Sequence, residues 1–182
     1  MSQSLPKEFE ICFTREQIAA RVSELAEEII PWVQNAEKRT GQPALLVCVL
    51  RGAVFFFADL LREIPISVEP AFCRTWAYTT DSQLMDKIKI SNEDLEVRGR
   101  AVLIVDDICD SGATLEALQA MYSNQGAVEV RSVVAVHRQI AQARHNPAWA
   151  AFLYTGSEWF VGYGMDSGEK FRNLADIYRI RK

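Results

Sequence analysis

The middle of the chain reads Val102-Leu103-Ile104-Val105-Asp106-Asp107-Ile108-Cys109-Asp110-Ser111-Gly112-Ala113-Thr114. Residues 101–105 are a continuous apolar run, which is typical of a strand buried on both faces of a parallel sheet. We expect residues 106–112 to form a loop and residues 113–125 to form a helix that ends at Gly126. A buried strand, a polar loop and a helix in this order indicate an α/β protein.

The segments on either side extend this pattern. Apolar runs and β-branched residues predict further strands, and Pro and Gly mark their ends. The predicted elements are strands at 44–50, 66–78, 128–136 and 159–163, a helix at 54–64 and a turn at 164–168. With strands and helices alternating, we expect a mostly parallel sheet flanked by helices.

Two other segments have distinct patterns. Thr14-Arg15-Glu16-Gln17 is a capping-box sequence that predicts the start of an amphipathic helix. We expect this helix to kink or restart at Pro31. Residues 79–91 are polar and predict a long mobile loop, hairpin-like near 88–90. Long loops in compact domains are often lids over a site.

Length and composition set the broad class. The chain has 182 residues, 49% of them hydrophobic and 24% charged, and we expect one domain spanning residues 1–182. The net charge of −4 and a pI near 5.3 argue against a nucleic-acid partner, because such proteins usually carry a basic domain.

The cysteines and the N-terminus bear on the compartment. Cys12, Cys48, Cys73 and Cys109 are scattered without a C-x-x-C pair, so we interpret them as thiols in a reducing compartment. The N-terminus lacks the apolar core of a signal peptide, and no apolar run approaches the roughly 20 residues that span a bilayer. We therefore expect a cytoplasmic protein without membrane partners.

The central segment carries a specific chemistry. In open α/β sheets ligands bind at the carboxyl ends of strands, and amide groups at a helix start bind anions. The candidate phosphate-binding residues are Asp110, Ser111, Gly112, Ala113 and Thr114. The adjacent carboxylates of Asp106 and Asp107 would repel a phosphate but would accept hydrogen bonds from neighbouring sugar hydroxyls. Together they predict a ribose 5-phosphate site, although a solvated acidic pair or a metal-binding loop also fits two adjacent aspartates.

The segment resembles the phosphoribosyl pyrophosphate (PRPP) signature of the type I phosphoribosyltransferases: a hydrophobic strand, two acidic residues, then D-[ST]-G-x-T. The resemblance implies an α/β fold with a central, mostly parallel sheet, a mobile lid loop and a small hood. The N-terminal part and about residues 149–182 would form that hood. It also implies transfer of a 5-phosphoribosyl group from PRPP, with Mg²⁺ as cofactor.

Further segments resemble the hypoxanthine-guanine branch. Leu50-Arg51-Gly52-Ala53 is similar to its pyrophosphate loop, with Arg51 where lysine is usual, and the resemblance implies a cis peptide bond between Leu50 and Arg51. The implied pyrophosphate-binding residues are Arg51, Gly52, Tyr78 and Arg172. The Ser-Tyr pair that begins the family's lid is Ala77-Tyr78 here, which removes a hydroxyl.

The purine pocket is implied in the same way. His137 occupies the position of a lysine that reads the purine 6-oxo group, unless the register is shifted by one residue and Arg138 is the reader. The implied purine-binding residues are His137, Trp159, Phe160 and Asp166. Asp166, Asp106 and Asp107 are the implied magnesium residues. A lysine only donates, whereas a neutral imidazole either donates or accepts, depending on its tautomer. Adenine, which carries a 6-amino group, is therefore less strongly excluded as a substrate here than in family members that have the lysine.

The function implied by the resemblance is purine salvage, in which hypoxanthine or guanine is converted to IMP or GMP with release of pyrophosphate. Asp110 is the candidate general base. Two alternatives stay open at this point: a phosphoribosyltransferase that prefers adenine or xanthine, and a PRPP-sensing regulatory homologue that binds RNA. The resemblance also implies a homodimer or homotetramer.

Overall fold

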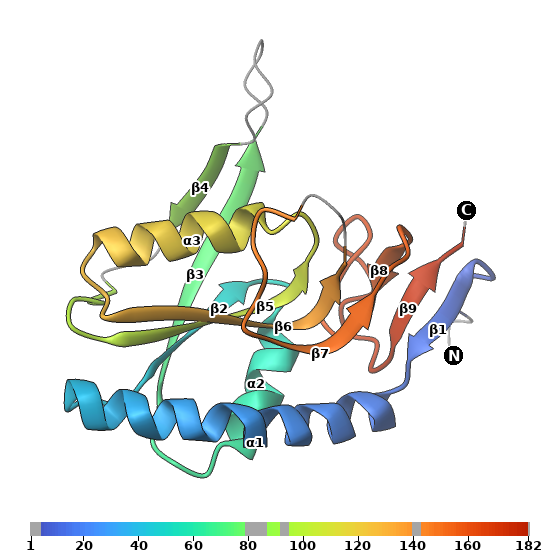
Figure 1. Ribbon diagram of the computed structural model, residues 1–182. Helices are drawn as coiled ribbons and strands as arrows, with labels where there is room; N and C mark the ends of the chain where they lie inside the picture. The colour runs from blue at the N-terminus through green and yellow to red at the C-terminus, as the bar shows by residue number, and fades with distance from the viewer. Residues whose placement is uncertain (1–4, 79–86, 92–94, 140–142, 182) are drawn as a thin grey trace.

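A six-stranded sheet forms the centre of the protein in the computed structural model, which describes residues 5–78, 87–91, 95–139 and 143–181 (Figure 1). The strand order is β4-β3-β2-β5-β6-β7. The strands are β2 Leu45–Leu50, β3 Glu69–Tyr78, β4 Lys87–Ser91, β5 Ala101–Cys109, β6 Glu129–Arg138 and β7 Trp149–Tyr154. Paired strands are parallel except β3 and β4, which are antiparallel. The predicted α/β class with a mostly parallel sheet is confirmed.

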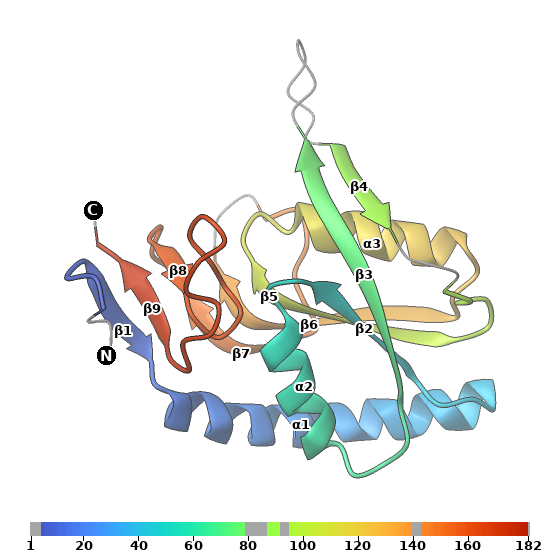
Figure 2. The same cartoon turned by 180° about the vertical axis from the view of Figure 1, so that it is seen from behind.

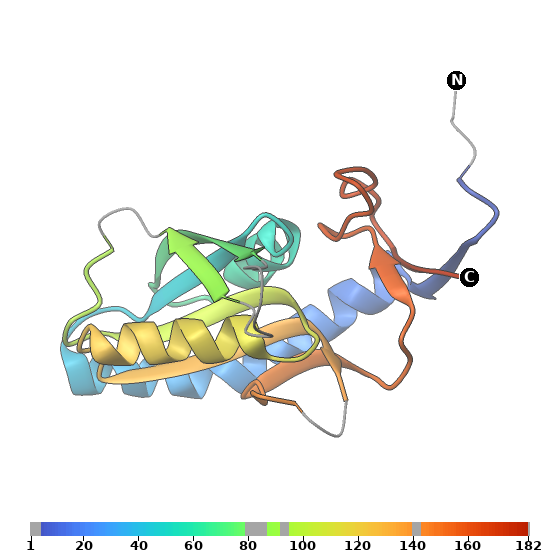
Figure 3. The ribbon, with the colours of Figure 1, turned by 90° about the horizontal axis from the view of Figure 1, so that it is seen from above.

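Helices cover both faces of this sheet. Helices α1 (Arg15–Thr40) and α2 (Val54–Glu63) pack on one face, and α3 (Ala113–Asn124) packs on the other (Figure 3). Side chains of β2 alternate between the two: Leu46 and Cys48 join the core under α1 and α2, whereas Leu45 and Val47 join the core under α3. Burial on both faces explains why β2 and residues 101–105 of β5 are continuous apolar runs.

Helix α1 begins as its sequence predicts. The Thr14 hydroxyl accepts a hydrogen bond from the Gln17 amide at 3.3 Å, and the Gln17 side chain accepts one from the Thr14 amide at 2.9 Å. The helix continues through Pro31 to Thr40, so the predicted restart at Pro31 is wrong. Gly41 ends it with φ of 70°, a left-handed conformation that suits glycine.

A second, antiparallel sheet joins the two ends of the chain. Its order is β1-β9-β8, formed by Phe9–Phe13, Ile177–Ile180 and Trp159–Val161 (Figure 2). This three-stranded sheet lies beside the carboxyl ends of β5 and β6 (Figure 1). The strand at Trp149–Tyr154, which the sequence assigned to the hood, is instead the edge strand β7 of the large sheet.

Two other predicted boundaries differ from the structure. Strand β5 extends to Cys109 rather than ending at 105, because β6 pairs with it as far as Cys109 and His137. Asp106 and Asp107 therefore lie within a strand and not in a loop. Within the predicted loop 79–91, Lys87–Ser91 forms β4, in agreement with the expected hairpin near 88–90. Residues 79–86, the rest of the predicted lid, lie outside the described residues.

The four cysteines are free thiols, in agreement with the sequence. Three of them are buried, and burial raises the pKa of Cys48 to about 12. Within the described ranges, no helix combines the length and the apolar character that crossing a membrane requires.

Candidate active site

A cleft of about 260 Å³ opens at the carboxyl ends of β2 and β5. The chain leaves β2 toward β3 on one side of the sheet and leaves β5 toward β6 on the other, so the cleft lies at a topological switch point, where open α/β sheets bind ligands. Its lining comprises Val49, Leu50, Gly52, Thr75 and residues 106–115. The structure thus brings the predicted ribose and phosphate residues together with Gly52 in one cavity.

The loop before α3 is built to receive an anion. Gly112 has φ of 80°, and a Cβ at this position would lie 2.7 Å from the backbone nitrogen of His145. The loop is held against the segment before β7 by a hydrogen bond that the Arg144 amide donates to the Ser111 carbonyl at 2.8 Å. Gly112 has no side chain to cap α3, and the only side-chain bond to the first amides in the described residues is a long one of 3.4 Å from the Ala113 amide to the Ser111 hydroxyl, so the positive end of the helix dipole lies at the cleft.

The paired carboxylates lie at the floor of the cleft. Asp106 is 6% exposed, and burial together with the charge of Asp107 raises its pKa well above the ordinary value. Burial also raises the pKa of Asp107. Asp106 accepts a hydrogen bond from the Asp107 amide and Asp107 accepts one from the Ile108 amide, each at 2.9 Å. Hydroxyl donors or a cation would stabilise the ionised forms of both groups.

Three loops converge beside Asp107. The Leu50–Arg51 peptide bond is cis, as the resemblance implied. A Cβ on Gly52 would lie 1.9 Å from an oxygen of Asp107, and a Cβ on Gly164 would lie 1.9 Å from the carbonyl oxygen of Gly52. The contact of Gly164 is with backbone and only glycine allows it, so the loops after β2 and β8 lie directly against each other, and Gly52 lets the first of them approach the Asp107 carboxylate in β5.

The two predicted pyrophosphate arginines meet at one carboxylate. Arg172 pairs with Asp166 at 2.6 Å and donates to the Gly164 carbonyl at 2.7 Å. Arg51 forms an ion pair with Glu169, whose carboxylate also lies 3.5 Å from Arg172. Glu169 was missed by the sequence reasoning. Its only signal is its place between Asp166 and Arg172 in a turn-rich segment.

The residues predicted to hold the purine lie at the ends of β6 and β8. His137 pairs with Cys109 across β5 and β6, and its Nε2 is buried with no hydrogen-bond partner among the described residues. Burial lowers the pKa of His137, which favours the neutral imidazole. Trp159 is 63% exposed and donates from Nε1 to the Asp166 carbonyl at 2.6 Å. Phe160 is buried, and its ring belongs to the core on the α1 and α2 side of the sheet.

The structure distinguishes His137 from Arg138, the two candidates for contacting the purine 6-oxo group. The Arg138 guanidinium already pairs with Asp110 and donates to the carbonyls of Gly156 and Glu158. Its donors are therefore engaged, whereas Nε2 of the neighbouring His137 is not. Asp110 itself is 64% exposed, so its second carboxylate oxygen is accessible from the cleft. Tyr78 ends β3, and its side chain lies outside the described part of the chain.

Comparison with known proteins assigns the sequence to one family. Residues 14–167 match the family described as phosphoribosyl transferase domain. The chain belongs to the phosphoribosyltransferases. It is 34% identical to the hypoxanthine-guanine phosphoribosyltransferase of Mycobacterium avium over 168 residues, which is 92% of this chain and 83% of that protein. It is 30% identical to the hypoxanthine phosphoribosyltransferase of Escherichia coli K12, with 94% of each chain covered.

Solved structures of phosphoribosyltransferases agree. A Trypanosoma cruzi hypoxanthine phosphoribosyltransferase variant complexed with the product IMP superposes with a TM-score of 0.84 at 27% identity, covering 98% of this chain and 94% of that one. A hypoxanthine-guanine phosphoribosyltransferase from Bacillus anthracis gives a TM-score of 0.83 at 27% identity, covering 94% and 98%. The recognition of this family from the PRPP signature is confirmed.

The donor set of this phosphoribosyltransferase fits magnesium. Burial disfavours the charge of the Asp106 and Asp107 carboxylates, and the charge of Arg172 favours it only at Asp107. Among the residues that the structure describes, no group of three or more metal-ligating side chains is present. Mg²⁺ commonly binds through one or two carboxylates together with waters and substrate oxygens, so the missing ligands would come from the substrate. Asp166, the third predicted ligand, is paired with Arg172 and is oriented by the Glu169 amide at 2.8 Å.

Proposed function

We propose that this enzyme transfers the 5-phosphoribosyl group of PRPP to hypoxanthine or guanine, giving IMP or GMP and pyrophosphate. The observation that carries the proposal is the cleft at the switch point, which combines buried carboxylates with an anion-binding loop at the start of α3. Relatives at 30–34% identity are named for this activity.

Each part of PRPP has a matching set of residues. The amides of residues 111–114 and the hydroxyls of Ser111 and Thr114 would hold the 5-phosphate. Asp106 and Asp107 would accept hydrogen bonds from the two ribose hydroxyls, which relieves the cost of burying their charges. Arg51, Gly52 and Arg172 would bind the pyrophosphate, and Arg172 would exchange its pairing with Glu169 for the substrate.

The reaction is a substitution at the anomeric carbon. The bond from this carbon to pyrophosphate breaks, a ring nitrogen of the base forms the new bond, and charge develops on the sugar as in glycoside cleavage. Arg51 and Arg172 stabilise the negative charge on the leaving pyrophosphate. Asp110 would accept the proton that the base loses, because its carboxylate is exposed at the rim of the cleft.

Magnesium, held by Asp106, Asp107 and a water on Asp166, would neutralise negative charge on the pyrophosphate. The purine would lie between Trp159 and the end of β6. Neutral His137 would donate to the 6-oxo group from the nitrogen that has no protein partner. The same imidazole in its other tautomer would accept from a 6-amino group, which keeps adenine as a second candidate base.

The test is a set of initial rates with PRPP and Mg²⁺ against hypoxanthine, guanine, xanthine and adenine, each as the sole base. The proposal expects hypoxanthine or guanine to be used well above adenine. Preference for adenine or xanthine would mean that His137 has changed the base pocket. Absence of turnover with every base would contradict the proposal and favour the PRPP-sensing regulator, which a gel shift with RNA would then test. The homodimer or homotetramer and the cytoplasmic location stay predictions.

A further inference from the structure

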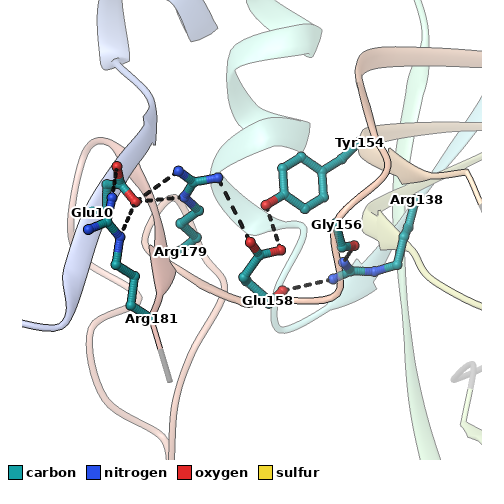
Figure 4. Close-up of polar contacts among 7 residues, drawn as sticks. All are labelled: Glu10, Arg138, Tyr154, Gly156, Glu158, Arg179 and Arg181. Atoms are coloured by element: carbon teal, nitrogen blue, oxygen red, sulfur yellow. Dashed lines mark hydrogen bonds and ion pairs between the residues drawn. The ribbon is translucent and has the colours of Figure 1, made fainter.

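Arg138 is a buried arginine with an unusually complete set of partners. Its side chain is 9% exposed at the end of β6. Nε pairs with Asp110 at 2.9 Å. Figure 4 shows the other two contacts, in which NH1 donates to the Gly156 carbonyl and NH2 donates to the Glu158 carbonyl at 3.0 Å. The guanidinium carbon also lies 5.6 Å from the ring centre of Tyr154 and 5.4 Å from that of Phe160. All three nitrogens of the planar fork are therefore engaged.

These contacts join two segments that are far apart in the sequence. Asp110 belongs to the loop between β5 and α3, and it is the proposed general base. Gly156 and Glu158 belong to the link between β7 and β8, immediately before Trp159. The position of this link fixes where Trp159 and the Phe160 backbone lie, since β8 has only three residues.

The same link is also held from the side of the three-stranded sheet. The Glu158 carboxylate accepts a hydrogen bond from the Tyr154 hydroxyl at 2.8 Å and lies 3.9 Å from Arg179. Arg179 pairs in turn with Glu10 at 2.9 Å, and Arg181 pairs with Glu10 at 2.6 Å (Figure 4). Glu10, Glu158 and Arg179 are about one-third exposed, whereas the Arg138 side chain is 9% exposed, so solvent screens its contacts to the two carbonyls less.

We propose that Arg138 is a positioning residue that sets the purine-binding segment, through the Gly156 and Glu158 carbonyls, at a fixed place relative to Asp110. The proposal rests on the proposed function of Trp159, Phe160 and Asp110. Arg138 touches neither substrate in this account, and it acts by holding the groups that do. A lysine at 138 would keep one positive charge but would lack the planar fork that reaches two carbonyls and a carboxylate together.

The test compares Arg138→Lys with a matched control, Arg100→Lys. Arg100 is likewise buried, and it pairs with Glu69 at 2.7 Å and donates to the Pro43 carbonyl at 3.0 Å, but it lies at the amino end of β5, away from the cleft. Both variants should lower Tm. Only Arg138→Lys should raise the KM for the base, by roughly tenfold or more, with the KM for PRPP within about twofold of wild type. Calorimetry should show the same contrast: Arg138→Lys should bind IMP more weakly than wild type and bind PRPP with nearly unchanged affinity, whereas Arg100→Lys should bind both as wild type does.

A second variant covers the case in which Arg138→Lys does not fold. Tyr154→Phe keeps the ring beside Arg138 but removes the hydroxyl bound to Glu158. It loosens the same link from its other side, so the KM for the base should rise by about two- to fivefold while that for PRPP stays constant.

The possible results distinguish a failure of the proposed function from a failure of the positioning role of Arg138. An inactive wild-type enzyme would contradict the proposed function. An active wild type, together with an Arg138→Lys variant whose two KM values change in parallel or match those of Arg100→Lys, would show that Arg138 is only a structural residue. An unchanged base KM in Tyr154→Phe would contradict the role of the link.

Discussion

Replacing Gly164 by alanine tests whether the close contact between the loops after β2 and β8 is needed for pyrophosphate binding. The new Cβ would lie 1.9 Å from the Gly52 carbonyl oxygen, whereas real Cβ contacts are essentially never below 3.0 Å. The clash is with backbone, so no side-chain rotation relieves it, and the Gly52 carbonyl must move by about 1 Å. A displacement of this size near reacting groups costs on the order of 10²-fold in rate.

The matched control is Gly168→Ala in the same turn-rich segment. Gly168 also has positive φ, 59° against 101° for Gly164, but its Cβ would meet nothing within 4 Å. Gly168→Ala costs about 1–2 kcal/mol for the left-handed backbone, and for a chain of this size each kcal/mol lowers Tm by about 2–4 °C. The φ of Gly164, 101°, lies beyond the left-handed region that alanine adopts, so its backbone cost exceeds that of Gly168, and the Tm difference between the two variants measures this excess together with the clash.

The assay is kcat/KM for PRPP at saturating hypoxanthine, with Tm measured on the same samples. We expect kcat/KM for PRPP to be about 10²-fold lower in Gly164→Ala than in Gly168→Ala, mainly because the KM for PRPP rises. If the two variants differ by less than about threefold, the contact between Gly164 and Gly52 does not position the pyrophosphate site, and the reasoning is refuted.

Three other substitutions test the charges of the site. Asp106→Asn should lower kcat/KM by about 10- to 100-fold through loss of a charge-assisted hydrogen bond, yet raise Tm at neutral pH, because folding raises the pKa of Asp106 and so disfavours its ionised form. Glu169→Gln should tighten pyrophosphate inhibition by about two- to fivefold, the range of an exposed ion pair, because a carboxylate no longer competes for Arg51 and Arg172. His137→Lys should raise the ratio of hypoxanthine to adenine use by roughly tenfold, because lysine only donates.

Each of these has its own control. The Tm gain of Asp106→Asn should disappear as the pH falls through the ordinary carboxyl pKa of 3.8, and a gain that persists in acid would contradict the burial argument. Glu16→Gln removes a carboxylate paired with Arg15 at 2.7 Å on the exposed surface, and an equal change in pyrophosphate inhibition there would mean a general charge effect. An unchanged base ratio in His137→Lys would place the reader of the purine elsewhere.

Local sequence patterns were sufficient for the elements that form the cleft. A strand buried on both faces of a parallel sheet is a continuous apolar run, so β2 and the first five residues of β5 could be predicted from the sequence. The two adjacent aspartates and the D-S-G-A-T loop lie next to each other in the chain, and their shared cavity follows from the strand–loop–helix order. The Thr14 cap is also local, because its two hydrogen bonds span three residues.

Features that depend on contacts distant in the sequence did not follow from local patterns, and only the family resemblance brought the two ends of the chain together in a hood. Strands β1 and β9 are short and pair between the two ends of the chain, which no local pattern indicates. Strand β5 continues past 105 only because β6 supplies partners. Arg138 is a charged residue that would ordinarily be exposed, and its burial depends on carbonyls 18 and 20 residues away. Glu169 reaches Arg51 across 118 residues, so its role was also hidden.

The most direct measurement is a product balance for wild type and Asp107→Asn, with PRPP, hypoxanthine and Mg²⁺. The account predicts that the wild-type enzyme forms IMP and pyrophosphate in equal amounts, and that Asp107→Asn forms both at a rate lower by about 10-fold or more. Pyrophosphate released without IMP would mean that PRPP is hydrolysed rather than transferred. Formation of neither product by the wild-type protein would contradict the central claim that the cleft is a phosphoribosyl-transfer site.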